Sequence, residues 1–300
     1  GTYPRLALLS DNSILVGYTQ ISGNQRTISV IRSTDNGGSF SPWGTIATNT
    51  NGGDLDNVYL LEVSKGNILA VFRNHDKNAS GAYTHYRITV CQSTDGGKTW
   101  AFISQAVESS IQGQGLWEPF LRIGNDGKVQ LTYSGELSTD NQETFRVVSS
   151  DGGKGWSAAV NLRIHSTSEK LRDGMQGIAR AKDAQDGRDA LIMVFETTRR
   201  GPGLFSVEYA VSYDDGASWG NRDVVYAPSA STKNAGSPQI AQVGDKGLVV
   251  AFMTDEDTAS PNWPSLASIK VVVSVGLNGG KIAWGGKATV QGATSAWPGL

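Results

Sequence analysis

The stretch Ser93-Thr94-Asp95-Gly96-Gly97-Lys98-Thr99-Trp100 is one of four copies of a turn motif that decides the fold. Every copy reads Ser-x-Asp-x-Gly-x-x-aromatic, and the other copies are Ser33 to Phe40, Ser149 to Trp156 and Ser212 to Trp219. Aspartate and glycine at fixed positions predict a tight turn in which the aspartate side chain accepts hydrogen bonds from turn amides. The aromatic residue would anchor the turn in an apolar seam, so we interpret the four aspartates as structural. A fifth, degenerate copy ends at Trp284 and lacks the aspartate.

A second repeat runs in phase with these turns. Short apolar strands are predicted to begin at Tyr3, Asn57, Glu118, Met175, Ser237 and Trp297. A turn and a second apolar run follow each of the first five, and a third strand then leads into the Asp turn. A unit of about 60 residues with four antiparallel strands is typical of a β-propeller blade.

The predicted fold class is therefore all-β, a six-bladed β-propeller in one catalytic domain over residues 1–300. Five complete blades fit into residues 1–292, and a sixth would begin at Trp297. Because a ring must close and open sheet edges are costly, we expect the sixth blade to be incomplete in this chain.

Composition agrees with many short strands and excludes several other classes. Glycine accounts for 37 of 300 residues, which disfavours a coiled coil or a helical bundle. No apolar run is long enough to span a membrane, and a net charge of −2 gives no sign of nucleic-acid binding. The single cysteine, Cys91, excludes an internal disulfide, and the three histidines lack metal-ligand spacing. We expect no metal and no cofactor, and we expect a monomer.

The predicted blade topology places candidate residues at one rim. The loop into the first strand and the loop from the second strand to the third open on the same face of a propeller, where ligands usually bind. Arginine, carboxylate and aromatic side chains gather at these positions and suit sugar hydroxyls and sugar faces. The predicted substrate-binding residues are Arg5, Tyr18, Asn57, Arg73, Trp117, Tyr133, Glu136, Arg172, Asp173, Met175 and Trp297.

Glu118 and Glu196 are the predicted catalytic pair, because glycosidic cleavage needs two carboxyl groups flanking one bond. Both lie within or beside apolar runs, Leu116 to Leu121 and Leu191 to Thr198, where an acidic residue is costly without a role or partners. The apolar setting of Glu118 favours a general acid. Arginines 199 and 200 after Glu196 favour an ionised nucleophile or base, but spacing does not decide the two roles. Glu136 is the alternative carboxylate.

The four Asp turns, the blade period and the Tyr3-Pro4-Arg5-Leu6 opening resemble the sialidase superfamily over the whole chain. Sialidases also use an arginine triad, an acidic residue after the second strand of blade one, and a tyrosine nucleophile. Here the loop after Tyr18 reads TQISGNQR and has no carboxylate, and Glu196 stands where a second arginine is expected.

The pattern is more similar to glycoside hydrolase family 93, the exo-α-L-1,5-arabinanases, which are secreted and mostly fungal. The segments around Glu118 and Glu196, with Arg172 to Gly177 between them, resemble the matching positions of that family. The resemblance implies two catalytic glutamates with retention of configuration, a substrate of linear arabinan or arabino-oligosaccharide, and release of arabinobiose from the non-reducing end. A sialidase and a noncatalytic glycan-binding propeller are the alternatives. The triplet Asn78-Ala79-Ser80 is a glycosylation acceptor and fits an extracellular protein.

Overall fold

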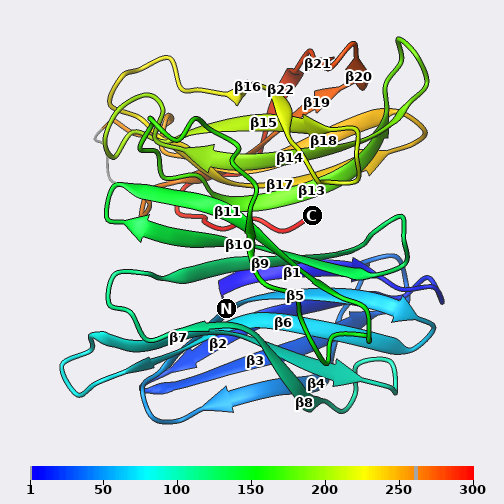
Figure 1. The fold of residues 1–300 in the computed structure, drawn as a ribbon, viewed down its shortest axis with the longest axis vertical. Coiled ribbons are helices and arrows are strands. Elements are labelled where there is room, and N and C mark those ends of the chain that lie inside the picture. Colours follow the sequence, from blue (N-terminus) through cyan, green and yellow to red (C-terminus); the bar gives the residue numbers. More distant parts are fainter. Residues whose placement is uncertain (1, 260–262) are drawn as a thin grey trace. The chain divides into compact units, whose positions relative to one another are not determined.

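The structure is a computed structural model that describes residues 2–259 and 263–300, and these residues form strands and no helix (Figure 1). The first sheet contains β1 (Thr2–Leu8), β2 (Ile14–Ser22), β3 (Gln25–Ser33) and β4 (Ser41–Asn49). The second contains β5 (Asp54–Ser64), β6 (Asn67–Lys77), β7 (Tyr83–Ser93) and β8 (Ala101–Ser109). The third contains β9 (Leu116–Ile123), β10 (Val129–Ser138), β11 (Asn141–Ser149) and β12 (Val160–Asn161).

Two further four-stranded sheets follow along the chain. The fourth contains β13 (Gly174–Lys182), β14 (Asp189–Thr197), β15 (Ser206–Ser212) and β16 (Gly220–Tyr226). The fifth contains β17 (Ala235–Val243), β18 (Gly247–Thr254), β19 (Ser268–Ser274) and β22 (Gly285–Gln291). A separate hairpin pairs β20 (Leu277–Asn278) with β21 (Lys281–Ile282). Within the described ranges, no helix is long and apolar enough to cross a membrane.

The sheets confirm the predicted all-β blades and correct their number. Each of the five sheets runs through its strands in chain order, as predicted for a blade. The described residues thus give a propeller fold with five blades and not six. The segment from Trp297 to Leu300 is not a strand. Its Trp297 N–H instead donates to Met253 Sδ at 3.4 Å.

The described chain divides into two compact units, which are treated separately below. The first unit comprises Gly1–Leu137 and Phe145–Val160, and the second comprises Ser138–Thr144 and Asn161–Leu300. Glu118 belongs to the first unit and Glu196 to the second. The single domain expected over residues 1–300 stays a prediction.

The Asp turns have the predicted internal hydrogen bonds. In the copy after β7, the Asp95 carboxylate accepts hydrogen bonds from the backbone N–H groups of Lys98 and Thr99, at 3.0 and 2.9 Å. Ser93 Oγ donates to Asp95 at 2.8 Å and accepts from the Gly97 N–H at 2.8 Å. Gly97 has a φ of +89°, and a Cβ there would lie 2.9 Å from Leu15 Cδ1, so glycine is required on both grounds. The turn chemistry read from the sequence is confirmed.

The degenerate fifth copy receives a carboxylate from the preceding blade. Asp183, in the turn between β13 and β14, accepts hydrogen bonds from the N–H groups of Gly279 and Gly280 at 2.7 and 2.9 Å. It also accepts from the Tyr213 hydroxyl at 2.5 Å and the Gln185 N–H at 3.0 Å. Burial opposes the ionisation of Asp183, but these hydrogen bonds outweigh it and lower the pKa to about 2. The hairpin β20–β21 is therefore fastened without an aspartate of its own.

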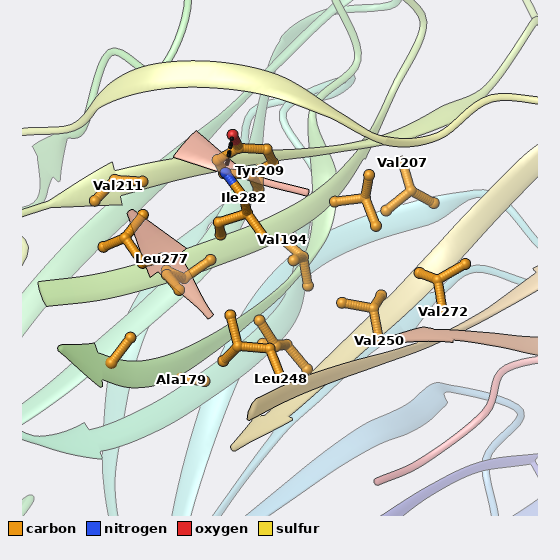
Figure 2. Close-up of a cluster of buried hydrophobic side chains, with 14 of the residues drawn as sticks. Ala179, Val194, Val207, Tyr209, Val211, Leu248, Val250, Val272, Leu277 and Ile282 are labelled. Carbon is orange, nitrogen blue, oxygen red and sulfur yellow. Dashed lines mark hydrogen bonds between the residues drawn. The ribbon is translucent and has the colours of Figure 1, made fainter. Parts of the chain in front are cut away.

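A buried apolar cluster in the second unit fixes strand β14, whose end carries Glu196 (Figure 2). Val194 of β14, Tyr209 of β15 and Val250 of β18 are at most 1 % exposed. Each such side chain contributes roughly 1.5–3 kcal/mol when fully buried. The Tyr209 hydroxyl accepts a hydrogen bond from the Ile282 N–H at 3.0 Å, so its polar end is satisfied inside the cluster.

The first strand of every blade carries the same irregularity near its start. The pairing of each first strand with its neighbour shifts register there, as at a β-bulge. One residue of each bulge is left-handed and is not glycine. These residues are Tyr3, Asn57, Glu118, Met175 and Ser237, with φ between 50 and 55° except for Tyr3 at 49°. Trp297 has the same conformation, with φ 53°. All six are the strand-start positions predicted from the second sequence repeat.

Candidate functional site

Glu196, near the end of β14, lies in a space provided by glycine. Its backbone is fixed between Gly174 of β13 and Val207 of β15. The half-buried side chain accepts a hydrogen bond at Oε2 from the Ser237 N–H at 2.7 Å. A Cβ on Gly236 would lie only 2.4 Å from that oxygen, so glycine at this position makes room for the carboxylate. The bulge of β17 therefore holds one oxygen of Glu196 through a backbone amide.

The arginines after Glu196 have partners of their own in neighbouring loops, and the expectation that they keep this carboxylate ionised stays a prediction. Arg199 pairs with Glu208 at 3.5 Å and with Glu169 at 3.6 Å. Arg200 donates to the backbone carbonyls of Lys233, Ala230 and Phe205, at 2.8, 3.0 and 3.4 Å. Both guanidinium groups thus tie neighbouring loops together, while the Ser237 N–H donates to the Glu196 carboxylate.

Trp263 is an aromatic neighbour of Glu196 that our sequence analysis missed. Its Cζ2 atom would lie 3.2 Å from a Cβ on Gly236, and its ring stacks on Phe205 with centroids 6.3 Å apart. Trp263 lies between β18 and β19, in a loop from a second strand to a third. Loops from a second strand to a third were predicted to face the ligand. A tryptophan in such a loop could therefore have been identified from the sequence as a candidate binding residue.

Asp173, a predicted substrate-binding residue, is part of a buried ion network in the second unit. The residue is fully buried, and its carboxylate contacts His165 Nδ1 at 2.8 Å and Arg222 Nη1 at 2.6 Å. Arg222 also pairs with Glu208 through Nε. Burial opposes the charge on Asp173, but the hydrogen bonds to His165 and Arg222 lower the pKa of its carboxyl group. These contacts give Asp173 a structural role, and its role in substrate binding stays a prediction.

Arg172 lines a pocket of about 410 Å³ within the second unit. The pocket is formed by the loop before β13, the loop between β14 and β15, and the hairpin between β10 and β11. Arg172 donates to the Thr139 carbonyl and to Gln142 Oε1, both at 3.0 Å. Met175, at the bulge two residues into β13, is 3 % exposed. The predicted convergence of these loop classes is therefore observed within this unit.

In the first unit, Arg73 belongs to a partly buried charge cluster at the start of β5. Its guanidinium pairs with Asp54 at 3.3 Å and with Asp56 at 3.5 Å, and Arg26 pairs with the same two carboxylates. The Tyr83 hydroxyl donates to Asp54 at 2.5 Å. Burial opposes the charge on Asp54, but Arg73 lowers the pKa of its carboxyl group. The formal charges of the two arginines and the two aspartates in this cluster balance.

An aromatic cluster surrounds the same arginine. Arg73 lies over the rings of Trp117 and Tyr3, at 5.3 and 5.7 Å from their centroids. The ring of His75 contacts Trp117 and Tyr83, with centroids 5.0 and 5.7 Å apart. Burial lowers the pKa of His75 to about 4, so this imidazole is neutral near pH 7. The indole of Trp117 is half-buried and packs against His75, Tyr83 and Arg73.

Glu118 and Asn57 occupy equivalent bulge positions in β9 and β5. Glu118 is half-buried, and the buried guanidinium of Arg5 lies in its electrostatic field. Burial lowers the pKa of Arg5 to about 10, although Glu118 and Asp56 favour the charged form. Asn57 is 5 % exposed, and within the described ranges neither atom of its carboxamide has a hydrogen-bond partner. An unsatisfied buried amide of this kind is rare in proteins.

The remaining predicted residues have mixed surroundings. Tyr133 stacks on Phe145, with centroids 5.6 Å apart, in a pocket of about 290 Å³. Glu136 lines this pocket and accepts a hydrogen bond from the Gly115 N–H at 3.2 Å. The hydroxyl of Tyr18 accepts from Gln20 at 3.0 Å. In residues 2–259 and 263–300, no group of three or more histidine, cysteine or acidic side chains is arranged to hold a metal ion.

Comparison with known proteins shows a resemblance in fold. No protein-family model and no curated protein matches the sequence. The structure is similar to an α-L-arabinanase of Penicillium chrysogenum complexed with arabinobiose, with TM-score 0.63, 16 % identity and coverage of 96 % of this chain and 92 % of that one. It is also similar to the GH93 α-L-arabinofuranosidase of Fusarium graminearum with arabinobiose. The TM-score is 0.64 and the identity 19 %, and the match covers 96 % of this chain and 92 % of that one. For an endo-1,4-β-xylanase of Bacteroides thetaiotaomicron, the TM-score is 0.59 and the identity 13 %, and the match covers 97 % of this chain and 96 % of that one. The expected resemblance to structures of family 93 is confirmed.

Proposed function

We propose that this protein is a secreted glycoside hydrolase that releases arabinobiose from the non-reducing end of linear α-1,5-L-arabinan. The fold similarity to arabinan-degrading enzymes, two of them in complex with arabinobiose, supports this substrate class. The observation that carries the proposal is Glu196, whose half-buried carboxylate is held by the Ser237 N–H in a space kept open by Gly236. A carboxylate that is held in one position beside a tryptophan ring suits a group that reacts with a bound sugar.

The proposed reaction uses Glu118 and Glu196 in two displacements. In the first, the Glu118 carboxyl group gives its proton to the glycosidic oxygen while the Glu196 carboxylate bonds to the anomeric carbon and the shortened arabinan leaves. In the second, water gives a proton to Glu118 and attacks the same carbon, which frees arabinobiose and restores Glu196. This retaining course needs carboxyl groups about 5–5.5 Å apart. The two roles can also be exchanged between the glutamates, and rescue of each variant by azide decides between them.

The test is hydrolysis of debranched linear arabinan by the wild type and by Glu118→Gln and Glu196→Gln. We expect arabinobiose as the first product and, in each variant, a loss of about 100-fold or more in kcat, since general acid–base catalysis contributes about 10²–10⁴-fold. Asp245→Asn is the control, because Asp245 is an exposed acid in the turn between β17 and β18. A loss of less than tenfold in both variants would refute the catalytic assignment. Proton NMR of the first-formed anomer tests retention.

Two further assays separate the alternatives. Hydrolysis of a fluorogenic sialoside, with no product from arabinan, would replace the proposal with a sialidase. Binding of arabino-oligosaccharides without any hydrolysis would indicate a noncatalytic propeller.

Secretion and a monomeric state are also part of the proposal. Asn78 and Ser80 of the acceptor triplet are exposed between β6 and β7, which leaves the asparagine accessible to glycosylation. Light scattering of the purified protein at about 32 kDa, near the 31.8 kDa of the chain, would support a monomer.

A further inference from the structure

The space beside Gly236 has an acid on one side and an aromatic ring on the other. A Cβ at this position would meet Glu196 Oε2 at 2.4 Å and Trp263 Cζ2 at 3.2 Å. The carboxylate and the indole therefore border the same small volume within the second unit. Both side chains are half-buried, so part of each residue remains accessible to solvent.

The ring is supported from beneath by a fixed residue. Trp263 stacks on Phe205 with an interplanar angle of 26°. The Phe205 N–H donates to Asn234 Oδ1 at 2.7 Å, and its carbonyl accepts from Arg200 at 3.4 Å. Arg200 in turn holds the Lys233 carbonyl, in the loop before β17, at 2.8 Å. A supported ring loses little conformational freedom when a ligand binds, which favours binding.

We propose that Trp263 is a platform on which a neutral sugar ring stacks beside Glu196, with Phe205 as its support. The C–H face of a sugar is apolar and fits an indole, while its hydroxyl groups turn to polar neighbours. The charged group bordering the space is a carboxylate, so a neutral sugar is favoured over an anionic one. The sugar class rests on the proposed function, but the stacking does not require the bond to be cleaved.

Binding is measured in a Glu196→Gln background, so that no substrate is consumed. Arabinobiose, arabinotriose and xylobiose are titrated by calorimetry against this protein and against its Trp263→Ala and Trp263→Phe derivatives. We expect Trp263→Ala to weaken the Kd about tenfold or more through the loss of aromatic contact area, and Trp263→Phe to restore most of it. Phe102→Ala, which removes an aromatic side chain 61 % exposed in the first unit, is the control and should stay within twofold.

The outcomes separate this proposal from the proposed function. Unchanged arabinobiose binding in Trp263→Ala overturns the platform and leaves the arabinanase proposal standing. Binding of xylobiose but not of arabinose oligomers, lost in Trp263→Ala, supports the platform and contradicts the arabinan substrate. No binding of any neutral saccharide contradicts both. In the active enzyme, Trp263→Ala should raise KM more than it lowers kcat for short oligosaccharides.

Discussion

Gly236→Ala mainly tests the position of the Glu196 carboxylate, because Glu196 Oε2 is the atom nearest to the added methyl group, while Trp263 Cζ2 at 3.2 Å has to give way by only a few tenths of an ångström. The backbone of Gly236 is not left-handed, so alanine is permitted there apart from its contacts. The added methyl group would lie 2.4 Å from Glu196 Oε2, closer than Cβ contacts occur in proteins. The carboxylate must therefore move by about 1 Å, and a misplacement of that size can lower a rate about 100-fold. We expect kcat on linear arabino-oligosaccharides to fall about 30- to 100-fold.

The same variant should fold normally, because the far end of a glutamate can rotate away from the methyl group. We expect its Tm to stay within about 3 °C of the wild type, a change of about 2 kcal/mol or less for a chain of this size. Gly220→Ala is the matched control, since a Cβ there meets no atom within 4 Å and its backbone is also not left-handed. Gly236→Ala with activity within threefold of wild type would refute the claim that this carboxylate must occupy the observed place.

Two further predictions concern stability. Asp183→Asn should cost about 2 kcal/mol through weaker hydrogen bonds to the fifth turn and lower the Tm by about 3 °C. Because the folded pKa of Asp183 is about 2, below its ordinary value of 3.8, this contribution is present above about pH 4 and disappears as the pH falls to about 2. A Tm difference that stays constant down to pH 2 would contradict this account. Arg222→Met leaves the buried carboxylates of Asp173 and Glu208 without their shared cation, so it should cost about 3–5 kcal/mol. Calorimetry should show a Tm about 5–8 °C lower, and an unchanged Tm would show that the ion network is not needed.

The blades could be predicted from sequence because their signals are local. The Ser, Asp and Gly of each turn bond within a few residues, as the contacts of Asp95 show, so the motif nearly determines its own geometry. The start of each first strand was equally visible, since its bulge recurs with the blade period. The number of blades was wrong because periodicity alone treated the segment at Trp297 as a strand.

The candidate site was harder to predict, because charged residues find partners far away in sequence. Asp173 lies directly before β13, as expected, but Arg73 lies within β6 and not at its end. The partners of both residues come from other strands and could not be seen in the sequence. Asp183 fastens a turn 96 residues further along the chain, which no local motif reveals. Trp263 was missed since its loop lies beyond the end of the apolar run that guided the search.

The left-handed residue at the start of each first strand has a consequence for how this protein could change its chemistry. A side chain other than glycine in this conformation costs about 1–2 kcal/mol, yet Tyr, Asn, Glu, Met and Ser occupy the five positions. One backbone shape is thus kept while size, charge and polarity differ at every copy. A substitution at such a position changes the functional group that is presented, while the backbone conformation of the strand stays the same. New specificities could then arise one residue at a time, on a scaffold whose folding already tolerates the strain.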